Sequence, residues 1–151
     1  MCERQEGCVF CKCSTRCDDY VLFEGKHCFI ILNRYPYVNG HLMIIPERHL
    51  GGFEELTALE RTEIFDLLDV AVKVLKEAMQ PDGFNVGMNL GKAAGAGIAE
   101  HVHMHVIPRW EGDTNFMTVV GNVRVVPEDL AVTAAKLIPL FEKYTRGGEK
   151  R

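Results

Sequence analysis

Three histidines at every second position, His101, His103 and His105, are the residues best suited to chemistry in this chain. Alternate side chains of a β-strand lie on one face, so this spacing places the three imidazoles side by side. The apolar residues that alternate with them would face the core: Val102, Met104 and Val106. The pattern indicates a functional histidine cluster; a metal-binding tract and a solvated histidine strand are the alternative interpretations.

A loop rich in glycine and alanine, residues 91–97 (GKAAGAG), comes directly before this strand. Small side chains let backbone N–H groups approach a phosphate closely. By itself such a loop is equally consistent with a flexible turn. Its position before three histidines on one face makes it a candidate anion site.

Cysteines gather near the N-terminus, where four of the six lie between Cys8 and Cys17. In a reducing compartment this spacing indicates metal binding rather than disulfides. Cys8 and Cys11 form a C-x-x-C pair that can share one Zn²⁺, although redox chemistry and no function remain alternatives. A site of four thiolates that includes Cys13 and Cys17 competes, but one residue between Cys11 and Cys13 is awkward for a tetrahedral centre. Cys28 is expected to be a small core residue.

The elements that must position these residues follow from hydrophobic periodicity and turn signals. A long helix is expected over 57–79, where Thr57 and Glu60 have capping-box spacing. Pro139 should kink or interrupt a C-terminal helix over 127–145, which opens with Pro127 and with Glu128 and Asp129 in its first turn. The strands expected are 21–23, 28–32, 41–45, 84–90, 102–108 and 119–126. These elements predict an α+β fold with a mainly antiparallel sheet.

Length and composition limit the classes of protein. The chain has 151 residues, 47% of them hydrophobic and 25% charged, and a net charge of −4. It is therefore expected to be a single domain over 1–151, with a cysteine-rich segment at 8–17. The mild negative charge argues against nucleic-acid binding, and no apolar run reaches the length of a membrane span. A polar N-terminus without a signal-peptide core predicts a cytoplasmic protein.

The run His101-Val102-His103-Met104-His105-Val106-Ile107 resembles the signature of the histidine triad (HIT) superfamily of nucleotide hydrolases and transferases. Four further segments resemble one branch of this superfamily, that of the Fhit-like and diadenosine-tetraphosphate phosphorylase proteins. They are residues 33–42 (NRYPYVNGHL), residues 84–90, the glycine loop and residues 108–116 (PRWEGDTNF). The resemblance covers about residues 8–125. It implies a HIT-like five-stranded sheet with one long helix and a C-terminal helix, and a homodimer whose sheets join across the two-fold axis.

The resemblance also implies a mechanism. His103 would attack the α-phosphorus of a nucleotide and form a nucleotidyl-histidine, which divides one difficult displacement into two steps. A neutral imidazole is a suitable nucleophile at pH 7 because its pKa lies near 6.5. His105 and His41 would flank the phosphate and help to protonate the leaving group. A histidine at 105 argues against the galactose-1-phosphate uridylyltransferase branch, which carries glutamine there.

Nucleotide-binding residues are carried over in the same way. Asn33 would contact the ribose, with a turn residue as the alternative, and Ile31 would pack on the base. Asn89 would supply an amide ahead of the loop, with an ambiguity of one residue toward Leu90. Trp110 would stack on a second base, or else serve the core or a dimer interface. The phosphate contacts would come from Gly95, Ala96, Gly97 and Ile98, where this chain lacks the serine or glutamine that related proteins often carry.

In the zinc-containing HIT branch, the N-terminal C-x-x-C is joined by a histidine after the third strand and by the first histidine of the triad. The matching residues here are Cys8, Cys11, His49 and His101. The resemblance therefore implies a closed structural Zn²⁺ site that leaves His103 available. Mg²⁺ on the substrate phosphates is a second candidate metal.

Together these features predict an enzyme that cleaves dinucleoside polyphosphates, with diadenosine tetraphosphate as the leading substrate, by hydrolysis or phosphorolysis. A purine nucleoside phosphoramidate hydrolase of the Hint type is the alternative within the same chemistry. A nucleotide-binding signalling protein with incidental turnover, and a purely structural zinc protein, are alternatives from other classes.

Overall fold

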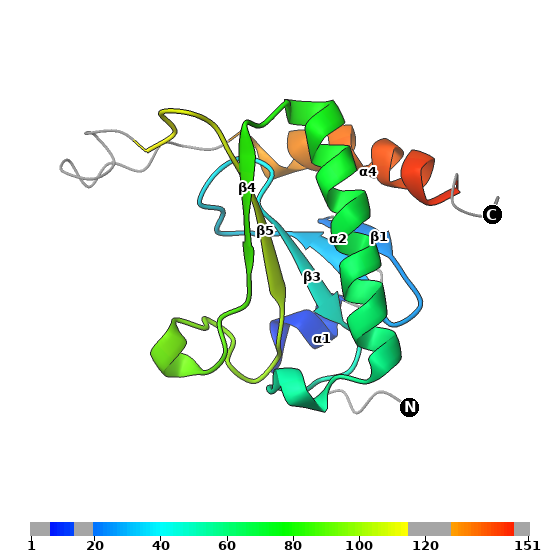
Figure 1. Ribbon diagram of the computed structural model, residues 1–151, viewed down its shortest axis with the longest axis vertical. Helices are drawn as coiled ribbons and strands as arrows, with labels where there is room; N and C mark the ends of the chain where they lie inside the picture. Colours follow the sequence, from blue (N-terminus) through cyan, green and yellow to red (C-terminus); the bar gives the residue numbers. More distant parts are fainter. Residues whose placement is uncertain (1–6, 14–19, 115–127, 147–151) are drawn as a thin grey trace.

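Five antiparallel strands form one sheet in the order β1-β2-β3-β5-β4 (Figure 1). The computed structural model describes residues 7–13, 20–114 and 128–146. The strands are β1 (Val21–Glu24), β2 (Cys28–Leu32), β3 (Leu42–Pro46), β4 (Gly83–Gly87) and β5 (Met104–Arg109). The expected antiparallel sheet is confirmed, and the expected strands 28–32 and 41–45 pair with each other as β2 and β3.

One face of the sheet packs against two long helices, α2 (Ala58–Met79) and α4 (Leu130–Arg146). The helix α2 begins where the capping box predicts. Thr57 Oγ1 accepts a hydrogen bond from the Glu60 N–H (3.2 Å), and the Glu60 carboxylate accepts one from the Thr57 N–H (2.8 Å). Both residues satisfy N–H groups that the first turn leaves without a helical partner. The core on this face includes Cys28, as expected, and the apolar residues that alternate with the histidines, Val102, Met104 and Val106.

The other face of the sheet carries the short helix α1 (Val9–Cys13). Phe10 of α1 packs there on every second residue of two strands, Phe29 and Ile31 of β2 and Met43 and Ile45 of β3. Met43 is paired across the sheet with His105. Since residues paired in this way share a face, His105 lies on the α1 side, opposite α2 and α4.

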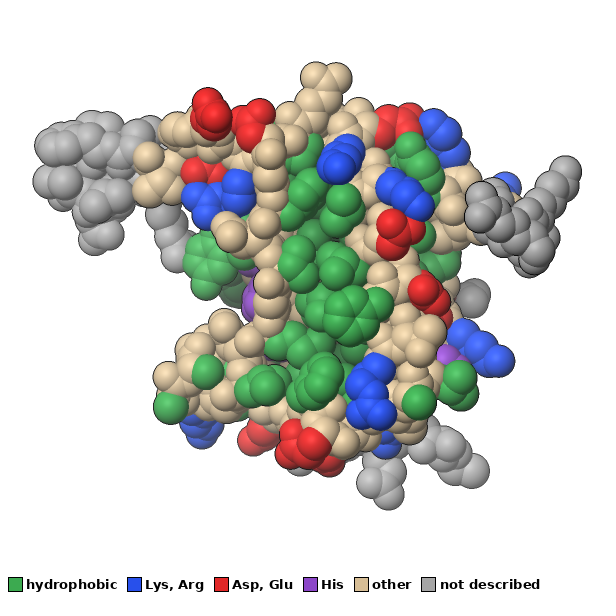
Figure 2. All heavy atoms as spheres, in the orientation of Figure 1, with side chains coloured by type: hydrophobic (Ala, Val, Ile, Leu, Met, Phe, Trp, Pro, Cys, Tyr) green, Lys and Arg blue, Asp and Glu red, His purple; other side chains and the backbone are tan. Residues whose placement is uncertain are grey.

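The strand β4 lies at the edge of the sheet, with its central and last residues exposed. Figure 2 shows hydrophobic side chains gathered on the face that α2 and β4 present. The large exposed hydrophobic residues of these two elements are Leu59, Phe65 and Val86. An edge strand beside an apolar patch is a surface that commonly pairs with another chain.

Several boundaries differ from the predictions. The expected strand 84–90 ends at Gly87, the last residue of β4 that pairs with β5. The chain then enters a loop that contains the short 3-10 helix η2 (Lys92–Ala94). A second 3-10 helix, η1 (Phe53–Glu55), precedes α2. The expected strand 102–108 begins at Met104, because the Val102 N–H bonds the Leu50 carbonyl (2.7 Å) in a neighbouring loop rather than a strand. The expected strand 119–126 lies outside the described residues.

The C-terminal helix also starts later than the expected residue 127. Asp129 precedes it, and its carboxylate accepts a hydrogen bond from the Ala131 N–H (2.9 Å), which is the role of an N-cap residue. The placement of Glu128 and Asp129 inside the first turn is therefore wrong, and Pro127 lies outside the described residues. Pro139 does not interrupt the helix. Fully buried Leu137 and Phe141 hold the turns on both sides of it against the core.

None of the helices in the described part of the chain is long and apolar enough to cross a membrane.

Candidate active site and metal centre

His103 is held by a hydrogen bond to the backbone of His101. Its Nδ1 lies 2.9 Å from the carbonyl oxygen of His101. A carbonyl only accepts hydrogen bonds, so Nδ1 carries the proton in the neutral ring. Nε2 is then the unprotonated nitrogen, which is the form that a nucleophile requires.

His105 and His41 form a connected pair on the same face. Nε2 of His41 lies 2.8 Å from Nδ1 of His105, and Nδ1 of His41 accepts a hydrogen bond from the Tyr37 N–H (3.3 Å). Because a backbone N–H only donates, the proton of neutral His41 lies on Nε2 and is donated to His105. His105 must then carry its own proton on Nε2. The pair therefore presents an N–H donor next to His103, whose ring centroid is 4.8 Å from that of His105.

Burial keeps these imidazoles neutral. It is the main cause that lowers the pKa of His41 and of His105 to about 4, and the neighbouring histidines lower both further. Burial also lowers the pKa of His103, against the opposing effect of the hydrogen bond to the His101 carbonyl. At pH 7 the rings therefore have the protonation that the hydrogen-bond pattern requires.

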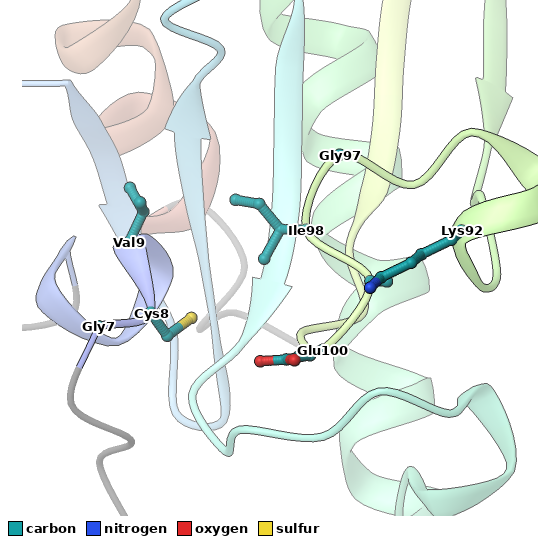
Figure 3. Close-up of a pocket in the computed structure, with 8 residues that line it drawn as sticks. Gly7, Cys8, Val9, Lys92, Gly97, Ile98 and Glu100 are labelled. Carbon is teal, nitrogen blue, oxygen red and sulfur yellow. The ribbon is translucent and has the colours of Figure 1, made fainter.

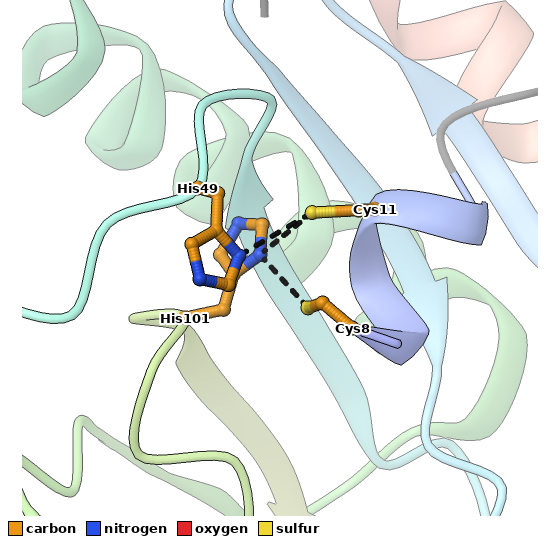
Figure 4. Close-up of side chains that lie close together, drawn as sticks. All are labelled: Cys8, Cys11, His49 and His101. Carbon is orange, nitrogen blue, oxygen red and sulfur yellow. Dashed lines mark hydrogen bonds between the residues drawn. The ribbon is translucent and has the colours of Figure 1, made fainter. Parts of the chain in front are cut away.

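Four side chains come together around His101, the first residue of the histidine run (Figure 4): they are those of Cys8, Cys11, His49 and His101. One ligand atom from each lies within 4.8 Å of all the others. Sγ of Cys8 and of Cys11 lie 3.4 and 3.7 Å from Nδ1 of His101, and Sγ of Cys11 lies 3.4 Å from Nδ1 of His49. The four residues predicted as metal ligands are thus brought together.

This donor set fits Zn²⁺. Nε2 of His101 lies 2.8 Å from the Pro46 carbonyl and must donate to it, which leaves Nδ1 unprotonated toward the two sulfurs. Two sulfur and two nitrogen ligands are typical of tetrahedral zinc, whose bond lengths place neighbouring ligand atoms about 3.3–3.8 Å apart. The three sulfur–nitrogen distances given above lie in that range. Of the competing four-thiolate site, Cys17 and the side chain of Cys13 lie outside the described residues.

Of the residues predicted to hold a nucleoside, Asn33 contacts the histidine cluster directly. Asn33 forms a turn, since its Oδ1 accepts the Tyr35 N–H (2.9 Å), and its amide nitrogen lies 3.4 Å from both ring nitrogens of His41. Ile31 is 2% exposed and packs in the cluster around Phe10. The Asn89 amide donates to the Gly95 carbonyl (3.5 Å) at the base of the glycine loop.

A pocket of about 440 Å³ opens between the glycine loop and the start of α1 (Figure 3). Gly97, Ile98 and Ala99 line one side, and Gly7, Cys8 and Val9 line the other. Gly95, at φ +87°, adopts the left-handed conformation that makes the tight turn before it. Lys92 also lines the pocket, together with Glu100, and no motif in the sequence had marked it as a binding residue.

Trp110 follows β5 directly and is half-buried in a turn that Asp113 closes. The Trp110 N–H donates to the Asp113 carboxylate (3.2 Å), which also binds Arg109 through two hydrogen bonds of 2.5 and 2.7 Å. The i,i+4 spacing of Arg109 and Asp113 could have indicated this pair. Tyr37 was missed as well: its ring stacks on His41 with the centroids 5.2 Å apart, although 75% of the side chain is exposed.

Comparison with known proteins places the chain in a family. A model of the HIT domain matches residues 14–112. The chain belongs to the HIT domain family. An AP-4-A phosphorylase of Mycobacterium tuberculosis is 47% identical over 113 residues, which are 75% of this chain and 58% of that protein. An adenylylsulfatase of Arabidopsis thaliana, HINT3, is 35% identical over 112 residues, 72% of this chain and 55% of that protein. The chain therefore matches little more than half the length of these two relatives.

Solved structures share the fold of this HIT domain. A hypothetical histidine triad nucleotide-binding protein of Sulfolobus tokodaii superposes with a TM-score of 0.77 at 27% identity, covering 95% of this chain and 97% of that one. A Zn-bound histidine triad family protein of Mycobacterium smegmatis has a TM-score of 0.76 at 24% identity, covering 93% and 97%. The expected HIT-like α+β fold is confirmed.

Proposed function

We propose that this protein is a nucleotidyl hydrolase or transferase that cleaves dinucleoside polyphosphates, with diadenosine tetraphosphate as its substrate, through a covalent intermediate on His103. The observation that carries the proposal is the hydrogen bond from Nδ1 of His103 to the His101 carbonyl. It fixes the tautomer with an unprotonated Nε2, beside an N–H donor supplied by His105 and His41. The 47% identity to an AP-4-A phosphorylase supports the choice of substrate.

In the first step, Nε2 of His103 attacks the α-phosphorus and the bond from phosphorus to the bridging oxygen breaks. The electron pair of that bond leaves with ATP, and the negative charge on its departing oxygen is stabilised by a hydrogen bond from the Nε2–H of His105. His41 keeps its proton on Nε2 and donates a hydrogen bond to Nδ1 of His105, which holds His105 in the tautomer that donates to ATP. The Nδ1–H of His103 stays on the His101 carbonyl and so spreads the positive charge of the phosphorylated ring. In the second step, water or inorganic phosphate attacks phosphorus, the P–N bond breaks, and AMP or ADP is released.

The binding residues follow from this role. Asn33 would hold the ribose and Ile31 the base, while Trp110 would stack on the second base. Backbone N–H groups of residues 95–98 would hold the phosphates, and the hydrogen bond from the Asn89 amide to the Gly95 carbonyl would stabilise the loop. Lys92, which lines the neighbouring pocket, adds a cation where this loop lacks a hydroxyl or amide side chain.

We also propose a structural Zn²⁺ bound by Cys8, Cys11, His49 and His101, where the ion would hold the N-terminal segment against the start of β5. Mg²⁺ with the substrate phosphates, a homodimer and a cytoplasmic location stay predictions. The exposed edge strand β4 beside an apolar patch supports the homodimer.

Product analysis tests the proposal. Purified protein is incubated with diadenosine tetraphosphate, with and without inorganic phosphate, and the nucleotides are separated by anion exchange. ATP with ADP, formed only in the presence of phosphate, identifies phosphorolysis; ATP with AMP in both conditions identifies hydrolysis. His103→Asn should abolish turnover and retain nucleotide binding. An unchanged dinucleotide in both conditions would refute the proposed substrate.

A second candidate is cleavage of a mononucleotide with a small leaving group, as in the phosphoramidate hydrolases of the Hint type. The 35% identity to an adenylylsulfatase favours it. The same His103 chemistry applies, so adenosine phosphoramidate and adenylylsulfate belong in the same assay. Binding without turnover of any of these substrates would instead favour a signalling role.

A further inference from the structure

Phe10 touches both functional centres of this domain. It lies between the two cysteines of the metal cluster, on α1, and is 4% exposed. Its ring meets His101 edge-on, with centroids 5.5 Å apart and an interplanar angle of 87°. It meets His103 in the same way, at 5.0 Å and 63°. One side chain therefore contacts a metal ligand and the nucleophile.

The orientation of the His103 ring depends on such contacts. The hydrogen bond from Nδ1 to the His101 carbonyl fixes one atom of the ring. Two aromatic neighbours restrict rotation of the rest, namely Phe10 and His105, whose ring is inclined at 70° to that of His103. His105 is itself held by β5 and by His41. Phe10 is the neighbour that arrives on a separate element.

That element needs help to stay in place. The helix α1 has five residues, far fewer than an isolated helix requires in water. The structure joins its segment to the sheet through the Phe10 side chain and through Cys8 and Cys11 beside His49 and His101. A metal that binds all four ligands would therefore favour the docked position of α1, and with it the contact between Phe10 and His103.

We propose that Phe10 is a positioning residue that couples metal binding at Cys8 and Cys11 to the orientation of His103, so that the metal site and the nucleotide site strengthen each other. The proposal rests on the function proposed above, since it assumes that a nucleotide binds at His103. Coupling between two binding equilibria is reciprocal. Zn²⁺ must raise the affinity for a nucleotide by the same factor by which the nucleotide raises the affinity for Zn²⁺.

The test uses the full chain in its metal-stripped and Zn²⁺-loaded forms, with AMP as the probe. Isothermal titration calorimetry gives the two dissociation constants for AMP, and a chromogenic chelator in competition gives the Zn²⁺ affinity with and without AMP. We expect about a tenfold coupling in both directions, in the usual range for coupled sites. Amide hydrogen exchange over Val9–Cys13 should also slow when Zn²⁺ binds.

Phe10→Leu should reduce the coupling to less than about twofold while the variant still binds both ligands, because leucine keeps apolar volume and loses the ring edge. Phe29→Leu is the matched control, since Phe29 is a phenylalanine of the same cluster, 1% exposed, and lies on β2 rather than on α1. It should keep the full coupling even where it lowers stability. A general weakening of the cluster would instead affect both variants equally.

Equal AMP affinity in the two forms of the wild type would overturn the proposal, and so would full coupling in Phe10→Leu. These failures are distinct from failure of the proposed function. A loaded protein that cleaves diadenosine tetraphosphate but shows no coupling refutes only the role of Phe10. A protein that shows coupling to AMP but cleaves no dinucleotide refutes only the proposed reaction, and one that binds no AMP refutes both.

Discussion

Zn²⁺ should stabilise this domain in a way that depends on its free concentration. The four ligands come from three separate parts of the chain, Cys8 and Cys11, then His49, then His101, and only the folded chain brings them within 4.8 Å of one another. Of these four ligands the unfolded chain keeps only Cys8 and Cys11 close together, with Cys13 and Cys17 as further nearby thiols. The metal therefore binds the native state preferentially and shifts the unfolding equilibrium by mass action.

The magnitude follows from chain length and ligand linkage. Each tenfold increase in free Zn²⁺ above the dissociation constant adds about 1.4 kcal/mol to the free energy of unfolding, and a thousandfold excess adds about 4 kcal/mol. A chain of 151 residues has an unfolding entropy of about 0.3 kcal/mol/K near its Tm. We therefore expect the Tm to rise by about 4 °C for each tenfold increase in free Zn²⁺, and by about 13 °C in all. Binding by the unfolded C-x-x-C pair would reduce both numbers.

The assay is differential scanning calorimetry over a series of buffers that fix the free Zn²⁺ concentration. His49→Asn removes one ligand and should lose most of the dependence. His27→Asn is the matched control, because His27 is the one histidine of the sequence that belongs neither to the metal cluster nor to the group of His41, His103 and His105. A wild-type Tm independent of Zn²⁺, or an unchanged dependence in His49→Asn, would refute the reasoning from the four ligands.

Three further predictions concern charge and burial. The pKa values of His41 and His105 are lowered to about 4, below the ordinary 6.5, so their contribution to stability is complete above pH 6.5 and is lost as the pH falls toward 4. Urea titrations between pH 7 and 4 should therefore show the free energy of unfolding falling across this interval, and a flat profile would contradict the prediction. Tyr37→Ala should expose His41 and move the acid limb of the pH–rate profile upward toward 6.5, whereas Tyr37→Phe should leave it in place, because the phenyl ring keeps the stack on His41. Glu60→Gln should lower the free energy of unfolding by about 1–2 kcal/mol at pH 7, allowing for the half-exposed partner Arg48. The hydrogen bonds from Arg48 are the main cause that lowers the pKa of Glu60 to about 2, so the stabilisation is present above pH 4.5 and is lost as the pH falls through 2. The difference in stability between wild type and variant, measured by urea denaturation, should therefore disappear in acid, and a difference that persists there would argue against the ion pair.

Local pattern was sufficient for much of the fold. The 3.6-residue periodicity and the capping box predicted a helix over 57–79, and α2 spans Ala58–Met79 with Thr57 as its N-cap, because a helix end is defined by residues a few positions apart. Alternation of histidine and apolar residues predicted that Val102, Met104 and Val106 would enter the core. The same arguments failed at strand ends, where pairing partners decide: Val102 bonds a loop residue, Leu50, and β5 begins two residues late.

The metal ligands stand between these cases. The C-x-x-C pair is visible in the residues, but His49 and His101 lie 38 and 90 positions from Cys11, so spacing along the chain carries no information about their approach. Their assignment needed the family resemblance, and the structure brings the four together. The contact between Phe10 and His103 also joins residues that are far apart in the sequence, and neither periodicity nor the resemblance indicated it.

The residue types and their order along the chain were enough to predict the run of histidines, the glycine loop as a candidate anion site, and the helices and strands, since each depends on neighbours within one strand, helix or turn. Tertiary structure decided the protonation of the triad. The His101 carbonyl, the Tyr37 N–H and the Pro46 carbonyl each fix which nitrogen of a ring carries the proton, and burial keeps those rings neutral. The physical reason is that a tautomer depends on a partner within hydrogen-bond distance. Folding alone brings His105 to His41 and Pro46 to His101, because each of these pairs is far apart in the sequence.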